Sequence, residues 1–368
     1  MIRSHRIRLN PTPEQAAYFA RAAGTRRFVF NWGLAEWKRQ HEAGERPSAL
    51  ALKKQFNAIK GQQFPWVYAV TKCVVEGAFT DLAAAFKRFF EGRKAGRKVG
   101  FPRFKTKKRS RDGFYLANDK FDVSGHWLKV PKLGLVNMAE PLRLQGKILS
   151  AHITRSAAWW FVSIQVEMPD VPHQQLPGAV GIDLGINRLA TLSDGSVLEN
   201  QKPLWSLLRQ VKRLNRSLSR KQKGSKNCGK ARRKLARLHY RITCIRDDLL
   251  HKATTALAQQ YGFIGVESLH VRGMMRNRAL AQALGDAAFG RFVRLLTMKA
   301  AARNGAVQAV GRFYPSSKTC SRCGHVKPDL ALSERTFICP ACGFSLDRDW
   351  NAAINILNEA LRLSASSP

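Results

Sequence analysis

The pattern of apolar and polar residues predicts that the chain opens with a strand followed by a helix. From Ile2 to Leu9 apolar residues alternate with polar ones, which is typical of a strand with one buried face. Thr12, Pro13 and Gln15 then supply an N-cap, a first-turn proline and a capping-box glutamine. A helix should therefore begin directly after the first strand.

The residues up to about 170 predict a β-domain with helices inserted into it. Apolar residues recur at helical spacing over 25–37 and 71–90, so we expect a helix in each range. Alternating segments follow at residues 127–130, 142–144, 150–153 and 159–166. They predict a small β-barrel or sheet. If the first strand joins it, the helical region at about 13–100 is an insertion in a β-domain.

A linker with two prolines, residues 170–178, separates this region from a second domain. We therefore expect an α+β, multidomain fold class with domains at residues 1–172 and 173–368. The second domain begins with an apolar strand at 179–187, and a strand at 189–192 with its Ser-Asp-Gly turn predicts a hairpin.

Two long helical stripes over residues 203–258 predict a helical hairpin, joined near 224–229. Residues 202–246 contain sixteen basic residues and no acid. One face of the hairpin should pack while the other follows phosphates, although a basic face that is only solvated has the same pattern.

Two carboxylates interrupt apolar strands of the second domain. Asp183 lies inside the 179–187 strand, and Glu267 ends an apolar strand at 263–267. Burial of an ionised carboxyl group is costly unless it is hydrogen-bonded or bound to a metal. Both acids therefore indicate a site, although Asp183 would need no explanation on a solvent-facing edge strand.

A third carboxylate, Asp349, precedes the last helical segment. It shares a helical face with Ala352 and Ala353, whose small side chains would allow close approach to a sheet, whereas Asp347 suits an N-cap. We therefore prefer Asp349 as the ligand. Three such carboxylates can hold two Mg²⁺ or Mn²⁺ ions about 3.5–4 Å apart, a site for phosphodiester hydrolysis. The predicted catalytic residues are Asp183, Glu267 and Asp349.

Four cysteines predict a structural zinc site. Cys320 and Cys323 form one Cys-x-x-Cys pair and Cys339 and Cys342 another, with fifteen residues between them. Each pair can present two thiolates to one Zn²⁺, and four thiolates leave no open position for catalysis. Two disulfides or unpaired buried thiols are the other interpretations, but disulfides are typical of small secreted domains rather than of 368 residues. The zinc ribbon should cover residues 313–346.

The charge of the chain predicts a polyanionic partner. Lysine and arginine number 63 against 25 acidic residues, for a net charge of +38 and a pI near 10.8. Nucleic acid suits this charge. We expect no membrane association, since no apolar run is long enough to span a bilayer. The other cysteines lack ligand spacing and indicate thiols of a reducing compartment.

Residues 87–111 combine charge with aromatic rings. Twelve basic residues accompany a single acid, Glu91, and four phenylalanines lie among them. Cations neutralise phosphates and rings stack on unpaired bases, which favours nucleic-acid binding over a solvated loop. The candidate contacts are Arg93, Lys94, Arg97, Lys98, Arg103 and Lys105.

The ordered set of motifs resembles the TnpB (OrfB) proteins of bacterial and archaeal insertion sequences, which are relatives of type V CRISPR effectors. The matching segments are residues 28–32, 100–105, 181–185, 265–267 and 314–356. The resemblance covers nearly the whole chain. It implies a wedge β-barrel with an inserted helical recognition region, then a RuvC-like RNase H fold with a zinc-ribbon insertion.

The resemblance also implies a function and its partners. The RuvC acids of the family match Asp183, Glu267 and Asp349. The family implies an RNA-guided DNA endonuclease, with a guide RNA from the element's end and a double-stranded DNA target in the bacterial or archaeal cytoplasm, associated with the nucleoid. Guide pairing would select the sequence, beside a short motif read by the protein.

Position within the family suggests further contacts. Thr71, Lys72 and Glu76 are candidates for reading the adjacent motif. Lys318 and Arg348 would hold a scissile strand near the metals, since cations there offset phosphate charge. Ordinary surface charge is the other interpretation of these residues.

Two other functions fit the same sequence. Some relatives have lost their acids and only repress, but all three carboxylates are present here. A strand-transferring transposase of the partner type needs His-x-His, and none of the nine histidines forms it. Hydrolysis is therefore the preferred reaction, while oligomeric state is left open.

Overall fold

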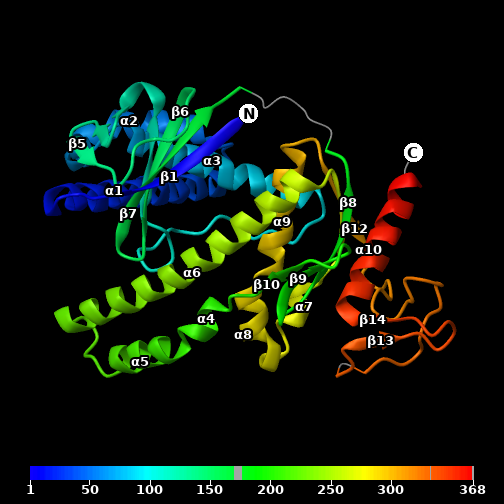
Figure 1. Cartoon of the computed structure of the whole chain (residues 1–368). Coiled ribbons are helices and arrows are strands. Elements are labelled where there is room, and N and C mark those ends of the chain that lie inside the picture. Colours follow the sequence, from blue (N-terminus) through cyan, green and yellow to red (C-terminus); the bar gives the residue numbers. More distant parts are fainter. Residues whose placement is uncertain (170–175, 332, 367–368) are drawn as a thin grey trace. The chain divides into compact units, whose positions relative to one another are not determined.

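The computed structural model describes residues 1–169, 176–331 and 333–366. The chain forms two compact units, Met1–Asp170 and Val171–Pro368 (Figure 1). The boundary expected between residues 172 and 173 lies outside the described residues. None of the described helices is long and apolar enough to cross a membrane.

The first unit begins as expected. Strand β1 (Ile2–Leu9) leads into helix α1 (Pro13–Glu42), and Thr12 caps that helix in a capping box with Gln15. The separate helix expected at 25–37 is wrong, because α1 continues without a break. Gly33 lies inside α1 where helix α3 (Cys73–Lys94) crosses, and a Cβ there would be 2.9 Å from a Leu82 methyl group.

The segment between α1 and α3 contains one further α-helix and a 3₁₀ turn. Helix α2 (Ala49–Gln63), which the apolar pattern did not predict, begins at an N-cap serine and ends before the 3₁₀ turn η1 (Pro65–Ala69). Phe30, Phe56 and Phe79, from α1, α2 and α3 respectively, are buried in one core.

The strands of the first unit are paired in two antiparallel sheets. One has the order β1-β7-β6-β2 and the other β3-β4-β5, with a single bridge from Leu9 to Met138. The bounds are β2 (Gly113–Ala117), η2 (Asn118–Lys120), β3 (Asp122–Ser124), β4 (Trp127–Val130), β5 (Gly134–Asn137), β6 (Lys147–Ser156) and β7 (Trp159–Glu167). Because β1 pairs with β7, the helices are an insertion in the β-domain, as expected. The strand expected at 142–144 is wrong.

The second unit is built on a five-stranded sheet of order β10-β9-β8-β11-β12. Strands β8 (Ala179–Leu184), β11 (Phe263–Glu267) and β12 (Ala306–Val310) are parallel. Strand β9 (Arg188–Leu192) is antiparallel to both β8 and β10 (Val197–Glu199), so β10 runs in the direction of β8. Four strands therefore have their carboxyl ends at one edge of the sheet.

Helices cover both faces of this sheet. Val180, Ile182 and Ile264 face a core that includes α6 (Lys226–Gln260) and α9 (Phe289–Ala301), and α10 (Arg348–Ala365) packs on β8 and β11 from the other face (Figure 1). Short helices α7 (Val271–Met274) and α8 (Arg278–Ala287) follow β11.

The expected helical hairpin is present with shifted ends. It consists of α4 (Pro203–Ser206), α5 (Leu208–Ser219) and the long α6, which begins at Lys226, so the joint lies earlier than 224–229. Val211, Leu238 and Ile242 form a small core between α5 and α6. The four cysteines lie around the two-stranded β13 (Thr336–Ile338) and β14 (Ser345–Asp347), directly before α10.

Candidate active site and metal centre

Register places Asp183 and Glu267 side by side at the carboxyl edge of the sheet. Gly181 is opposite Gly265 and Ile182 is opposite Val266, so the next residues on β8 and β11 are the two acids. Side chains alternate along a strand, and each acid therefore shares a face with the glycine two residues before it.

That face is the one covered by α10. A Cβ on Gly181 would lie 2.0 Å from the carbonyl oxygen of Ala353, and a Cβ on Gly265 would lie 2.8 Å from the Ala360 methyl group. Glycines on the sheet and alanines on the helix thus allow close contact. The two acids point toward the helix that carries Asp349, and Asp183 lies on a central strand, so the edge-strand interpretation is wrong.

Asp347 and Asp349 have the different positions expected from the sequence. Asp347 is the N-cap of α10, and its Oδ1 accepts the backbone N–H groups of Asp349 at 2.9 Å and Trp350 at 3.1 Å. Asp349 lies in the first turn with its carboxylate 3.4 Å from Nε of Arg348. Asp347 thus caps the helix, whereas Asp349 lies close enough to Asp183 for its charge to raise the pKa of that residue.

Trp350 fixes the start of α10 against the turn between β9 and β10. Its indole N–H donates to the carbonyl oxygen of Ser193 at 3.0 Å. Gly195, with φ of +87°, lies beneath the ring, where a Cβ would be 3.0 Å from Trp350. Sequence reasoning missed this contact, and the Trp350–Gly195 pairing has no local signature that could have revealed it.

The three carboxylates crowd one another electrostatically. Burial, then the charges of Glu267 and Asp349, raise the pKa of Asp183 well above its ordinary value. Burial also raises the pKa of Glu267 to about 7, against the lowering effect of the Leu184 N–H, which donates to its Oε1 at 3.1 Å. Carboxyl groups crowded in this way favour a bound cation.

A pH dependence of metal binding follows from these pKa shifts. A divalent cation must displace any proton on its carboxylate ligands, so protonation of Glu267 below about pH 7 should oppose it. We expect the Mg²⁺ concentration for half-maximal binding to rise about tenfold per pH unit below 7. Titrations at pH 6, 7 and 8 measure this, and a constant Mg²⁺ requirement would contradict carboxylate ligation.

The four cysteines have the geometry of a tetrahedral thiolate site. Their sulfur atoms all lie within 4.8 Å of one another, with Cys320–Cys342 at 3.7 Å and Cys323–Cys339 at 3.6 Å. A tetrahedron with Zn–S bonds of about 2.3 Å has sulfur atoms about 3.8 Å apart. The cluster fits structural zinc. Among the described residues no three carboxylates are as closely spaced as these thiols, and this includes Asp183, Glu267 and Asp349.

Two buried asparagines join α10 to the segment that leads into this cluster. The amide of Asn351 donates to the carbonyl oxygen of Thr319 at 2.7 Å and accepts the Ser321 N–H at 3.0 Å. Asn355 donates to Ser316 at 2.8 Å and to Thr319 at 2.6 Å. The cysteine cluster and the helix of Asp349 are thus hydrogen-bonded together, which sequence reasoning missed although the two amides share one helical face.

Lys318 and Arg348, on either side of the cysteine cluster in sequence, each already have a partner within the protein. The Lys318 ammonium donates to the carbonyl oxygen of Pro328 at 2.6 Å. Arg348 lies beside Asp349 and lowers the pKa of Asp183, against the stronger raising effects of burial and neighbouring acids. Arg348 thus lies among the acids, and Arg188 lies 3.3 Å from the carboxylate of Asp347.

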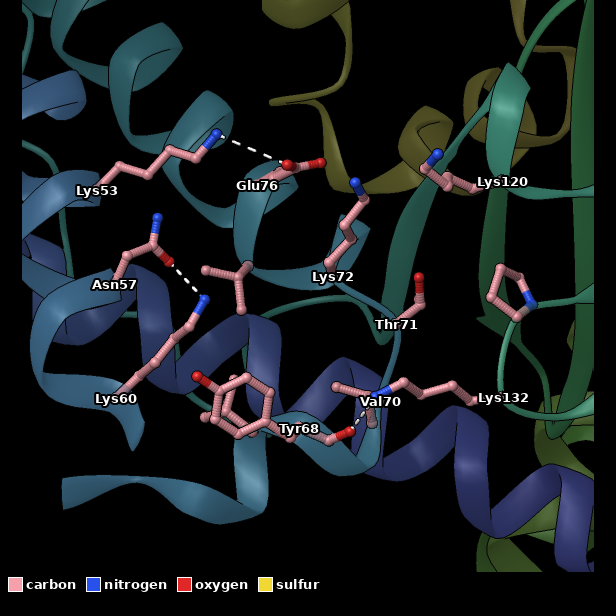
Figure 2. Close-up of a pocket in the computed structure, with 13 residues that line it drawn as sticks. Lys53, Asn57, Lys60, Tyr68, Val70, Thr71, Lys72, Glu76, Lys120 and Lys132 are labelled. Atoms are coloured by element: carbon pink, nitrogen blue, oxygen red, sulfur yellow. Dashed lines mark hydrogen bonds and ion pairs between the residues drawn. The ribbon is translucent and has the colours of Figure 1, made fainter. Parts of the chain in front are cut away.

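In the first unit, Thr71, Lys72 and Glu76 line one pocket, with a volume of about 430 Å³ (Figure 2). Thr71 is buried, and its backbone N–H donates to the Tyr18 hydroxyl at 3.0 Å. Lys72 is exposed. Other cationic residues on the pocket wall are Lys53, Lys60, Lys120 and Lys132. The pocket therefore combines five ammonium groups with one carboxylate.

The basic segment contains two kinds of residue. Arg93, Lys94, Arg97, Lys98 and Arg103 are exposed, as phosphate contacts require. Lys105 differs: its ammonium lies 2.8 Å from Asp81 and 3.9 Å from the centre of the Phe30 ring. Burial lowers its pKa. Lys105 thus differs from the exposed cations in forming a half-buried ion pair with Asp81, which the charge run could not distinguish, and its contact with nucleic acid stays a prediction.

Comparison with known proteins agrees with this layout. The OrfB_IS605 family, described as "Probable transposase", matches residues 163–278, and "Cas12f1-like, TNB domain" matches residues 289–356. A "Helix-turn-helix domain" matches residues 1–46, where the structure has β1 and the single long helix α1.

Relatives match over nearly the full length. A protein of Streptomyces pristinaespiralis named "Putative RNA-guided DNA endonuclease" is 35% identical over 99% of this chain and 90% of its own length. InsQ of Escherichia coli K12, with the same description, is 34% identical over 97% and 92%. A solved structure of the "mini-RNA-guided endonuclease CRISPR-Cas_phi3" has a TM-score of 0.52 at 11% identity, covering 98% of this chain and 92% of that one, and shows a shared fold. By its sequence matches over nearly its whole length, the chain belongs to the TnpB (OrfB) family.

Proposed function

We propose that this chain is an RNA-guided DNA endonuclease that hydrolyses phosphodiester bonds at Asp183, Glu267 and Asp349. The observation that carries the proposal is the meeting of the β8 and β11 acids on the face covered by α10, in a chain 35% identical to a relative named as such an enzyme. In this assignment the second unit is RuvC-like, with residues 313–346 as its zinc ribbon.

Asp183, Glu267 and Asp349 would hold Mg²⁺ or Mn²⁺, and the chemistry supplied by that ion would be activation of water and stabilisation of the leaving oxygen. Protein groups supply the orientation. The Leu184 N–H holds the Glu267 carboxylate, Asp347 caps the helix of Asp349, and Trp350 ties that helix to the β9–β10 turn. Arg348, which lowers the pKa of Asp183, would offset the negative charge of an entering phosphate.

The first unit would recognise nucleic acid. We assign it as the wedge and recognition region, with its two sheets as the wedge barrel. The pocket of Thr71, Lys72 and Glu76 is the candidate reader of the adjacent motif, because its ammonium groups attract a duplex backbone and its mixed polar wall offers both donors and an acceptor to base edges. The exposed cations from Arg93 to Arg103 would contact the guide or its duplex.

The guided function predicts a discrete RNA partner. Expressed with its native flanking DNA and purified, the chain should retain one RNA species that ends at the element boundary. Sequencing of the bound RNA measures this, and the same complex can then be given plasmids with a target matching that RNA and a randomised flank. Cleavage should occur next to a single short motif.

Other outcomes identify the competing functions. Heterogeneous RNA would contradict guided recognition. Tight target binding without cleavage in Mg²⁺ and Mn²⁺ would indicate a repressor, and joined rather than free DNA ends would indicate strand transfer. A complex of the Asp183→Asn variant, which should bind the target DNA without cutting it, is the control for each of these measurements.

A further inference from the structure

The second unit has a pocket at the same sheet edge as the catalytic acids, formed by segments that the proposed chemistry does not use. Its volume is about 400 Å³. It is lined by Ile186 after β8, by Lys202 and Trp205 after β10, and by Gln282 and Asp286 of α8, after β11. Because β8, β10 and β11 run in one direction, all three connections leave the carboxyl edge. Ligands of open α/β sheets bind at that edge.

The wall of the pocket presents an exposed aromatic ring on a fixed backbone. The Trp205 side chain is 69% exposed, the largest exposed fraction of any tryptophan among the described residues. Its backbone N–H donates to Oδ2 of Asp286 at 3.2 Å, and the preceding N–H of Leu204 donates to the same carboxylate at 2.9 Å. The backbone that carries the ring is therefore fixed by Asp286.

Asp286 is committed to this support. It is only 5% exposed, and Arg246 of α6 donates to its Oδ1 at 2.8 Å and to its backbone carbonyl at 2.9 Å. Its charge is thus compensated inside the fold. The groups left for a ligand are the indole face, the exposed amide of Gln282 and the ammonium of Lys202.

These groups match an unpaired nucleotide. An indole offers a stacking surface to any base, an amide can both donate to and accept from a base edge, and an ammonium neutralises the adjoining phosphate. The net charge of +38 favours a polyanion over an apolar ligand. Ile186 lies three residues after Asp183, and three residues span at most about 11 Å, so one wall of the pocket lies close to the sheet edge where Asp183 is found.

We propose that this pocket holds an unpaired base of the DNA strand that is cut, stacked on Trp205. The inference rests on the proposed nuclease function and adds a binding site for a nucleotide flanking the scissile phosphate. Trp205 would hold the strand in register with the acids, so that its loss affects strand binding before it affects chemistry.

The test uses the full-length chain carrying Asp183→Asn, so that the strand is not cut. Single-stranded DNA oligonucleotides with one 2-aminopurine at successive positions should be quenched at one position when bound. Trp205→Ala should remove that quenching and weaken binding about 5- to 150-fold, the loss of one base–aromatic stack. Trp205→Phe should restore most of both, whereas Trp127→Ala, another exposed tryptophan, should change neither.

An abasic site at the quenched position provides a second measurement. The abasic site should weaken binding to the protein that keeps Trp205. It should not weaken binding to Trp205→Ala any further, because both changes remove the same contact. Equal quenching with and without Trp205, or quenching by RNA oligonucleotides alone, would overturn the proposal. If 2-aminopurine is quenched by Trp205 but the unsubstituted protein cuts no DNA, the nuclease proposal fails and the base-binding pocket stands. If the unsubstituted protein cuts DNA and Trp205→Ala changes neither quenching nor binding, the pocket proposal fails and the nuclease proposal stands.

Discussion

Replacing Asp183 by asparagine should lower the DNA cleavage rate by about 1,000-fold or more while target binding is retained. A loss of that size corresponds to about 4 kcal/mol of transition-state stabilisation, within the range expected when a metal-binding carboxylate is removed. Asparagine has nearly the same shape, and it removes a carboxyl group whose pKa is raised by burial and by the neighbouring acids. Single-turnover cleavage with saturating enzyme measures the chemical step.

Asp347→Asn is a matched control for this variant. Asp347 is an N-cap, and asparagine caps helices as well as aspartate does, so activity should stay within a few fold of the unsubstituted enzyme. Asp349→Asn should behave like the Asp183 variant. Equal effects at 347 and 349 would mean that the ligand was assigned to the wrong carboxylate, and full activity of Asp183→Asn would refute the site.

Replacing Cys339 by serine should destabilise the second unit through loss of zinc. Structural zinc binding contributes directly to folding, and at about 2–4 °C per kcal/mol a loss of several kcal/mol lowers the melting temperature by about 10 °C. Zinc content should fall in parallel. Calorimetry together with metal analysis of the purified chain measures both.

Cys244→Ser is the control for this substitution, because Cys244 is an exposed thiol on α6 outside the cluster. It should retain one zinc and the original melting temperature. Since Asn351 and Asn355 hydrogen-bond α10 to the segment entering the cluster, the Cys339 variant should also lose cleavage. An unchanged melting temperature with zinc absent would show that the cluster is dispensable for folding.

Local signals predicted most of the elements that position the site. The capping box of Thr12, the apolar strands ending near Asp183 and Glu267, and the N-cap role of Asp347 depend on residues close in sequence, and the structure confirms them. The two Cys-x-x-Cys pairs predicted the four-cysteine cluster for the same reason, because each turn brings its own two thiols together.

The remaining features depend on contacts distant in sequence. Helix α2 has a weak apolar stripe, with only Leu52 and Phe56 buried, so its pattern gave no prediction. Lys105 belongs to a basic run by composition, but it forms a half-buried ion pair with Asp81 of α3. Trp205 is fixed by Asp286, 81 residues away, and no periodicity reports such a pair.

The length of α6 sets a scale for what the basic hairpin can touch. At about 1.5 Å per residue its 35 residues extend about 50 Å, and the stretch from Lys226 to Arg246 covers about 30 Å. One turn of duplex rises about 34 Å. Laid along the axis of a duplex, the basic stretch of α6 would span most of one turn, and shortening its tip by two helical turns, about 11 Å, would reduce that span to about 20 Å.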